Sequence, residues 1–249
     1  GGILKRLMEW ARKPAQGVRL RRACVGLVSG ILRASVLGLA MFGASAPIPL
    51  PAQEADAVSL MEEAGTRYRT IRAFCATFDQ VLEVPLLGET HISKGELCQA
   101  QPDLFSMRFS DPDGDEVVSD GEYFWVYYPS ADPGQVLQFS MEVRPGGLDF
   151  HREFLEAPAQ KYRLEYVGAE AIQGTPTHVV SAEPLDPSAF TEARLWLDQE
   201  RSLILQARIG MENGSIRTVT LTEIRLDPPP DPDRFVFRIP AGAQVIRRN

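Results

Sequence analysis

The chain has 249 residues, 44% of them hydrophobic and 24% charged, which supports a folded core and excludes a disordered or collagen-like chain. Its net charge of −7 is unevenly distributed. Residues 1–46 carry eight Lys or Arg and one Glu, which leaves 18 basic and 32 acidic residues, a net charge of −14, in 47–249. Phosphate backbones and anionic membranes repel so acidic a body, so we expect no nucleic-acid partner.

The first 46 residues have the features of a secretory signal peptide. The basic residues end at Arg33, and an uncharged apolar run and then three small residues follow up to Ala46. We therefore expect residues 1–46 to be a signal peptide, with cleavage between about 45 and 52, and residues 53–249 to form one exported domain. An uncleaved membrane anchor is the alternative, but Arg33 interrupts the stretch that would have to cross the bilayer.

The exported part contains two cysteines, Cys75 and Cys98, and an even number in an exported chain is typical of a disulfide. The turn sequence Pro85-Leu-Leu-Gly88 separates two strand-like runs. In a hairpin symmetric about this turn, opposed residue numbers sum to 173, as those of the two cysteines do. Their Cα atoms would then lie about 4.5–5.5 Å apart, within reach of a disulfide. Two buried free thiols are the alternative, because another loop length would shift the register.

The order of elements predicts a helix followed by an antiparallel sheet. Apolar residues over 54–70 have the spacing of one helix face, and from residue 73 onward the period changes to two. Turn signals at intervals near ten residues favour antiparallel pairing over β-α-β units. Residues 148–157 interrupt the strands as a short helix or loop. The expected strands are 73–84, 91–100, 104–110, 115–119, 123–128, 135–143, 162–168, 176–183, 192–198, 202–210, 215–225 and 234–238.

Bulky apolar residues gather on particular strand faces. Phe105, Met107 and Phe109 share one face of the third expected strand, whereas the strand at 123–128 is bulky on both faces. A strand that is apolar on both faces must have both covered, or one bound to an apolar ligand. Helices that cover one side are the simpler explanation.

The sequence contains no convincing catalytic or metal-binding arrangement. His91, His151 and His178 lack the spacing of metal ligands, so we expect them at the surface or in loops. The acidic run 111–116 superficially resembles a calcium loop, but Glu116 stands where such a loop needs glycine, and a hairpin turn explains the run. Nucleophile motifs and phosphate-binding loops are absent in a suitable context. We therefore expect no enzyme activity, no metal and no cofactor.

Four short segments, in order over about residues 60–136, carry a family resemblance. A helix leads into Phe74-Cys-Ala-Thr-Phe-Asp-Gln80, and Gly95-Glu-Leu97 follows. Pro102-Asp-Leu-Phe105 and then Val118-Ser-Asp-Gly-Glu-Tyr-Phe-Trp-Val-Tyr127 complete the set. Together they resemble the LolA-like outer-membrane lipoprotein carrier proteins.

The resemblance implies a mainly β fold, an unclosed antiparallel β-barrel with a helical lid over an apolar cavity. It also implies a monomeric periplasmic carrier in a Gram-negative-type envelope that shields the acyl chains of lipoproteins. Such a carrier takes its cargo from an inner-membrane lipoprotein-releasing transporter and delivers it to an outer-membrane acceptor. Because each methylene in water costs about 0.8 kcal/mol, the carrier needs a concave apolar surface. The alternative is a periplasmic lipid-binding or sensor module of the same fold that signals to a membrane partner.

The resemblance also assigns roles to residues. Met61 and Tyr68 are expected to make lid contacts. The family's arginine, which ties the lid to the sheet by hydrogen bonds to helix backbone, is Gln101 here, without the guanidinium fork and charge. Met107 stands where the family usually has tryptophan or a similar residue, and it keeps the position apolar and adaptable. The residues expected to line the cavity are Phe74, Phe78, Leu97, Phe105, Met107 and Trp125.

Overall fold

The computed structural model describes residues 56–141, 149–227 and 231–248. The expected signal peptide and its cleavage site lie outside the described residues. The helices are α2 (Ala57–Thr70), α3 (Phe150–Leu155) and α4 (Pro158–Lys161), and the 3-10 turns are η1 (Pro85–Leu87) and η2 (Pro232–Phe235). The strands are β1 (Ala73–Val84), β2 (Glu89–Ala100), β3 (Leu104–Asp111), β4 (Asp113–Asp120), β5 (Tyr123–Tyr127), β6 (Gln135–Ser140), β7 (Tyr162–Ile172), β8 (Thr175–Pro184), β9 (Phe190–Asp198), β10 (Ile204–Met211), β11 (Ile216–Leu226) and β12 (Gln244–Arg248).

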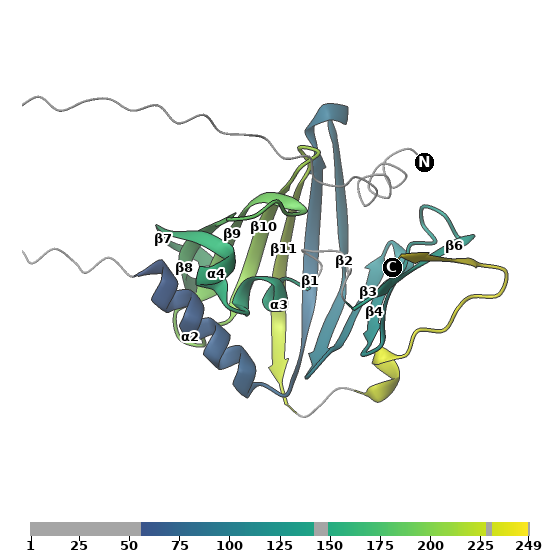
Figure 1. The fold of residues 1–249 in the computed structure, drawn as a ribbon, viewed down its shortest axis with the longest axis horizontal. Coiled ribbons are helices and arrows are strands. Elements are labelled where there is room, and N and C mark those ends of the chain that lie inside the picture. The colour runs from purple at the N-terminus through teal and green to yellow at the C-terminus, as the bar shows by residue number, and fades with distance from the viewer. Residues whose placement is uncertain (1–55, 142–148, 228–230, 249) are drawn as a thin grey trace, which may run out of the picture. The chain divides into compact units, whose positions relative to one another are not determined.

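All of these strands belong to one sheet, in the order β12-β6-β5-β4-β3-β2-β1-β11-β10-β9-β8-β7 (Figure 1). Neighbours pair antiparallel, except that β12 runs parallel to β6. Within the described residues β12 and β7 stand at the two ends of the sheet, so the sheet is unclosed. The expected mainly β fold with an unclosed, largely antiparallel sheet is confirmed.

The hairpin of β1 and β2 has the register that the sequence predicts. Ala73 pairs with Ala100 and Val84 with Glu89, so the residue numbers of opposed residues sum to 173 along the whole ladder. Gly88 ends the turn with a φ of 65°, a left-handed conformation that glycine adopts without steric cost. The turn therefore fixes which residues of β1 face which residues of β2.

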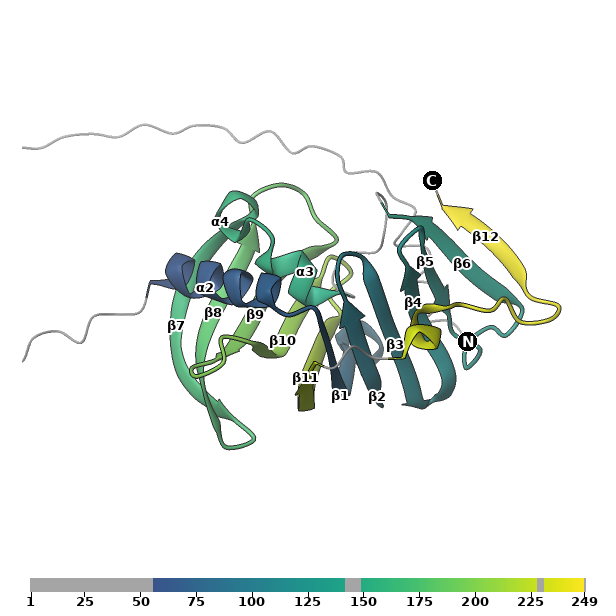
Figure 2. The same ribbon diagram turned by 90° about the horizontal axis from the view of Figure 1, so that it is seen from below.

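The helices α2, α3 and α4 lie over one face of the sheet, above β7 to β11 (Figure 2). We call this face the inner face, the opposite one the outer face, and the three helices the lid helices. The carboxylate of Asp56 accepts hydrogen bonds from the backbone N–H groups of Val58 and Ser59, at 3.3 and 3.2 Å, and α2 therefore begins at Ala57. Among the described helices, none has the length and apolar character that crossing a bilayer requires.

Glycine permits close contact between two of the lid helices. A Cβ added at Gly65 of α2 would lie 2.7 Å from the carbonyl oxygen of Leu155 in α3. Any larger residue at position 65 would push this carbonyl away, because backbone atoms cannot yield as a flexible side chain can. The absence of a side chain at Gly65 therefore lets α2 and α3 pack together over the inner face.

The C-terminal part differs from the expectation of a strand at 234–238. The structure has η2 up to Phe235, followed by extended chain, and a strand β12 that was not predicted. Phe235 packs against Cys75 and Cys98 on the outer face, and the ring of Phe237 stacks on Trp125 with 5.1 Å between the centroids. The alternating phenylalanines therefore reflect two contacts with the outer face, not pairing within the sheet.

Cys75 and Cys98 are opposed in the hairpin and joined by a disulfide that closes a loop with a sequence separation of 23. We predict that replacing both cysteines by serine lowers the free energy of unfolding by about 3 kcal/mol, because the unfolded chain regains the entropy of that loop. Urea unfolding monitored by circular dichroism measures the difference. The wild-type protein in reductant serves as the control and should lose the same amount, whereas an unchanged midpoint in both samples would contradict the prediction.

Candidate functional site

Five of the six residues expected to line a cavity lie in one buried apolar cluster on the inner face. They are Phe74, Phe78, Leu97, Phe105 and Met107, each at most 5% exposed. The register explains the grouping, because Leu97 is the direct partner of Met107 and residues two apart in a strand share a face. The inner face therefore concentrates apolar side chains from β1, β2 and β3 on the same side of the sheet as the lid helices.

Trp125 is the exception, and its prediction as a lining residue was wrong. Its neighbours in β5, Phe124 and Val126, belong to the inner cluster, so the alternation of the strand directs Trp125 to the outer face. There it stacks on Phe237, and its Nε1 donates a hydrogen bond to Asp120 Oδ2 at 2.8 Å. A strand that is bulky on both faces carries no signal for which face turns inward.

Aromatic rings continue the cluster beyond the predicted residues. Phe109 meets Phe78 edge to face at 5.1 Å and Tyr128 at 6.0 Å between ring centroids. Phe124 stacks on Phe105 at 6.0 Å. Phe109 lies four residues after Phe105 in the same strand and therefore faces the same side, so its place in the cluster could be predicted from the sequence. Phe124 carried no such signal, because its strand is bulky on both faces.

The lid helices contribute Met61 and Tyr68, the two residues that the sequence predicts to make lid contacts. Met61 of α2 is fully buried in the cluster. Tyr68, near the end of α2, packs against the cluster and meets Phe74 edge to face at 6.4 Å between ring centroids. Both side chains therefore reach the inner face, and displacement of α2 would uncover apolar surface on the helix and on the sheet alike.

His151 of α3 lies inside this contact and not at the surface, where we expected it. Its ring stacks on Tyr68 at 5.7 Å and meets Phe74 edge to face at 4.9 Å between centroids. Burial lowers the pKa of His151 to about 3, although a backbone hydrogen bond with Ile204 acts in the opposite direction. The imidazole is therefore neutral near pH 7. An isolated histidine in sequence gives no sign of such an environment.

Gln101 makes the lid contact that the arginine was expected to make. Its Nε2 donates to the carbonyl oxygens of Tyr68 at 3.1 Å and Ile71 at 3.0 Å, and a longer contact reaches that of Arg69 at 3.4 Å. Carbonyls at the end of a helix lack intrahelical partners, so a side-chain donor stabilises the end. The amide therefore ties the C-terminal end of α2 to the end of β2 without a charge.

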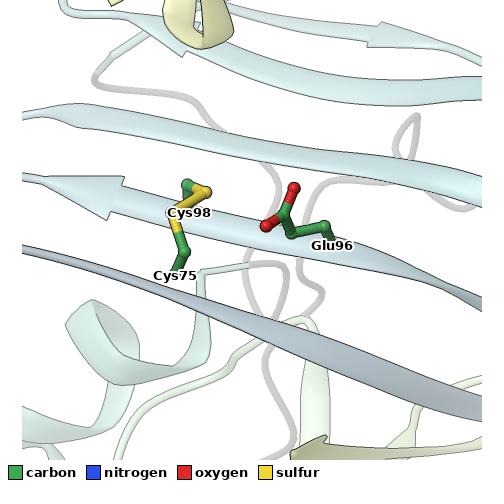
Figure 3. A group of neighbouring side chains, drawn as sticks. All are labelled: Cys75, Glu96 and Cys98. Atoms are coloured by element: carbon green, nitrogen blue, oxygen red, sulfur yellow. A yellow bond between two sulfur atoms is a disulfide. The ribbon is translucent and has the colours of Figure 1, made fainter. Parts of the chain in front are cut away.

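The outer face carries the disulfide, with Glu96 close by on the same strand as Cys98 (Figure 3). The two sulfurs and a carboxylate oxygen lie within 4.8 Å of one another, a spacing that resembles a metal site. The sulfurs are bonded to each other, however, and a disulfide offers no thiolate to a metal. Glu96 instead forms ion pairs with Arg225 and Arg234, the second of which comes from η2.

Comparison with known proteins agrees with this arrangement. The family model described as outer membrane lipoprotein carrier protein LolA matches residues 69–238. The chain belongs to the LolA family. The LolA resemblance that the four motifs carried is thereby confirmed, and the match spans every strand of the inner-face cluster.

Two LolA relatives and one solved structure illustrate the likeness. An outer-membrane lipoprotein carrier protein of Halorhodospira halophila is 30% identical over 156 residues, 61% of this chain and 69% of that protein. The corresponding protein of Chromohalobacter salexigens is 26% identical over 206 residues, 82% of this chain and 94% of that protein. An uncharacterized conserved protein from Thermus thermophilus has a TM-score of 0.50 at 14% identity, covers 77% of this chain and 99% of its own, and shows a shared fold alone.

The role of Gln101 in holding α2 can be tested by substitution. We predict that Gln101→Leu lowers the free energy of unfolding by about 1 kcal/mol and speeds amide hydrogen exchange in the last turn of α2, because the carbonyl oxygens of Tyr68 and Ile71 lose the side-chain amide that joins them to β2. Hydrogen exchange measured by mass spectrometry resolves the helix. Gln101→Arg supplies new donors and should restore the protection, whereas unchanged exchange in Gln101→Leu would show that the helix end is held by other contacts.

The buried neutral state of His151 predicts a pH dependence of stability. Between pH 6.5 and about 3 the unfolded state binds a proton at this residue that the folded state does not, so stability falls as the pH falls. Between pH 7 and pH 5 we expect the free energy of unfolding of the wild type to fall by about 2 kcal/mol more than that of His151→Phe. Each pH unit below the ordinary pKa of histidine corresponds to about 1.4 kcal/mol. Urea unfolding at the two pH values measures this, with His91→Gln as the control for an exposed histidine. Equal losses in wild type and His151→Phe would contradict the assignment.

Proposed function

We propose that this protein is a periplasmic carrier that shields the acyl chains of lipoproteins and transfers them from an inner-membrane transporter to the outer membrane. The observation that carries the proposal is the inner-face cluster, an aromatic and aliphatic surface on the same side of an unclosed sheet as the lid helices. Membership of a family described as outer membrane lipoprotein carrier proteins supports the same assignment. The inner-face cluster would be the surface that replaces water around the acyl chains.

The energetics of the cargo favour a surface of this kind. A palmitoyl chain with about 14 methylenes costs roughly 11 kcal/mol when it is fully exposed to water, at about 0.8 kcal/mol for each methylene. Phenylalanine rings and the flexible side chain of Met107 offer apolar contact area without fixed polar partners. Such a surface accepts acyl chains of different length and saturation, as a carrier of many lipoproteins requires.

Cargo entry would require the lid helices to move, because side chains of α2 and α3 are themselves part of the cluster and its residues are almost fully buried. Polar contacts also hold α2 among the residues that the structure describes. They include the amide of Gln101 at its end and a hydrogen bond of 2.6 Å from Ser202 Oγ to Glu63 Oε1. Helical lids that open on the microsecond-to-millisecond timescale are common at sites that must exclude water. We therefore assign binding and release of cargo to displacement of α2 and α3 from the inner face.

The charge of the exported part fits movement between two membranes. A net charge of −14 in residues 47–249 keeps the carrier from adhering to anionic headgroups. Capture and release would then depend on specific partners, which are an inner-membrane lipoprotein-releasing transporter and an outer-membrane acceptor. An uncharged or basic carrier would remain attached to either surface.

The test is binding of a synthetic triacylated lipopeptide, measured by native mass spectrometry on protein purified from the periplasm. We predict one-to-one binding by the wild type and a loss of at least about tenfold in affinity for Phe78→Glu, because a carboxylate within the inner face disfavours an acyl chain. Trp125→Ala is the matched control, since it removes an aromatic ring from the outer face of the same sheet and should leave binding unchanged.

Circular dichroism establishes whether each variant is folded, and transfer of the lipopeptide from the loaded protein to vesicles measures release. Failure of the wild type to bind any lipopeptide would overturn the proposal. A bound free lipid that is never released to vesicles would instead favour the lipid-binding or sensor module of the same fold.

A further inference from the structure

Gln99 is a buried polar residue in the middle of the apolar inner face. In the β-ladders it lies between Phe74 of β1 and Phe105 of β3, both members of the inner-face cluster, and it is 3% exposed. A glutamine at such a position lowers the apolar area available to an acyl chain and requires hydrogen-bond partners. Its presence within the proposed binding surface therefore calls for a partner of defined chemistry.

One half of the Gln99 side chain has its partner in the lid. Its Nε2 donates to Oδ1 of Asp149, the residue that precedes α3. A carboxylate only accepts hydrogen bonds, so the amide nitrogen must face Asp149 and the amide oxygen must point away from it. The orientation of the amide, which is often ambiguous in a glutamine, is thus fixed by the chemistry of its neighbour.

The other half of the side chain has no hydrogen bond. Gln99 Oε1 is buried and lacks a hydrogen-bond partner among the residues that the structure describes. An unsatisfied buried acceptor is unfavourable, and it can be relieved only by an N–H or O–H donor. The inner face around it supplies apolar side chains such as Phe74 and Phe105, which have no donor to offer.

Acylated molecules differ in whether they carry such a donor next to the chain. An acyl chain attached to an amine through an amide has an N–H at the point of attachment, whereas an ester-linked chain has only acceptors there. We propose that Gln99 Oε1 accepts a hydrogen bond from the N–H of an amide-linked acyl chain, and that Gln99 thereby makes the carrier prefer N-acylated lipopeptides to lipids whose chains are all ester-linked. This inference rests on the proposed carrier function and names its cargo class.

Two probes that differ by one group test the inference. They are N-palmitoylglycine methyl ester and its analogue in which the amide N–H is replaced by oxygen, so that chain length and shape are matched. We expect protein purified from the periplasm and freed of lipid to bind the amide about tenfold more tightly than the ester, the ratio that corresponds to one hydrogen bond to a buried acceptor. Isothermal titration calorimetry or displacement of a fluorescent fatty acid gives both affinities.

Variants assign the preference to Gln99. Gln99→Leu removes the acceptor at similar volume and should bind both probes with equal affinity. Gln138→Leu is the matched control, because Gln138 is also a buried glutamine but lies opposite Trp125 on the outer face, where its Oε1 accepts from Arg247 Nε at 3.2 Å. This control variant should bind the amide probe more tightly than the ester probe by the same factor as the wild type.

Each outcome decides the inference. Equal binding of the two probes by the wild type would overturn it and leave the carrier proposal intact, because the acyl chain would still be held without the hydrogen bond. A preserved ratio in Gln99→Leu would also overturn it, since the preference would then arise elsewhere. Failure of the wild type to bind either probe would overturn the carrier proposal and this inference together. The comparison of probes on the wild type does not depend on the variants being folded.

Discussion

The pairing of β1 with β2 is the constraint on which the two faces of this sheet depend. One continuous antiparallel ladder joins the two strands, so the alternation of side chains is fixed at every position. Phe74, Ala76 and Phe78 face the lid helices, whereas Cys75 and Thr77 between them face the other side. A shift of one residue between the two strands would turn the apolar set of one strand to the outer face. It would also leave Cys75 and Cys98 on opposite faces of the sheet, where they could not form a disulfide.

Most of the fold was predictable because its determinants are local. The symmetric turn determined the register of the first hairpin, the change of period marked the end of α2, and the spacing of turns indicated antiparallel strands. The features that were missed depend on contacts between distant segments. Trp125 faces outward because Phe237 covers it there, and β12 exists because β6 offers it an edge. Neither contact can be predicted from the residues of the strand that makes it.

The polar residues near the inner face were the least predictable part of the site. Gln99, Gln101 and His151 all lie where the lid helices meet the sheet, and each is satisfied or buried only through the tertiary structure. Gln101 could be assigned a role from the sequence only because it lies beside a family motif, and Gln99 could be assigned none. A buried neutral histidine is likewise a property of its surroundings, since the same residue in a loop would titrate near its ordinary pKa.

The position of η2 has a consequence for the chemistry of the disulfide. Phe235 packs over Cys75 and Cys98, which are 9% and 1% exposed, and Arg234 approaches the sulfur of Cys98 at 3.6 Å. A reductant must reach a sulfur atom in line with the bond that it breaks, so it can attack only after the C-terminal segment has moved aside. The rate at which this bond is reduced in the folded protein therefore measures how often the C-terminal segment opens.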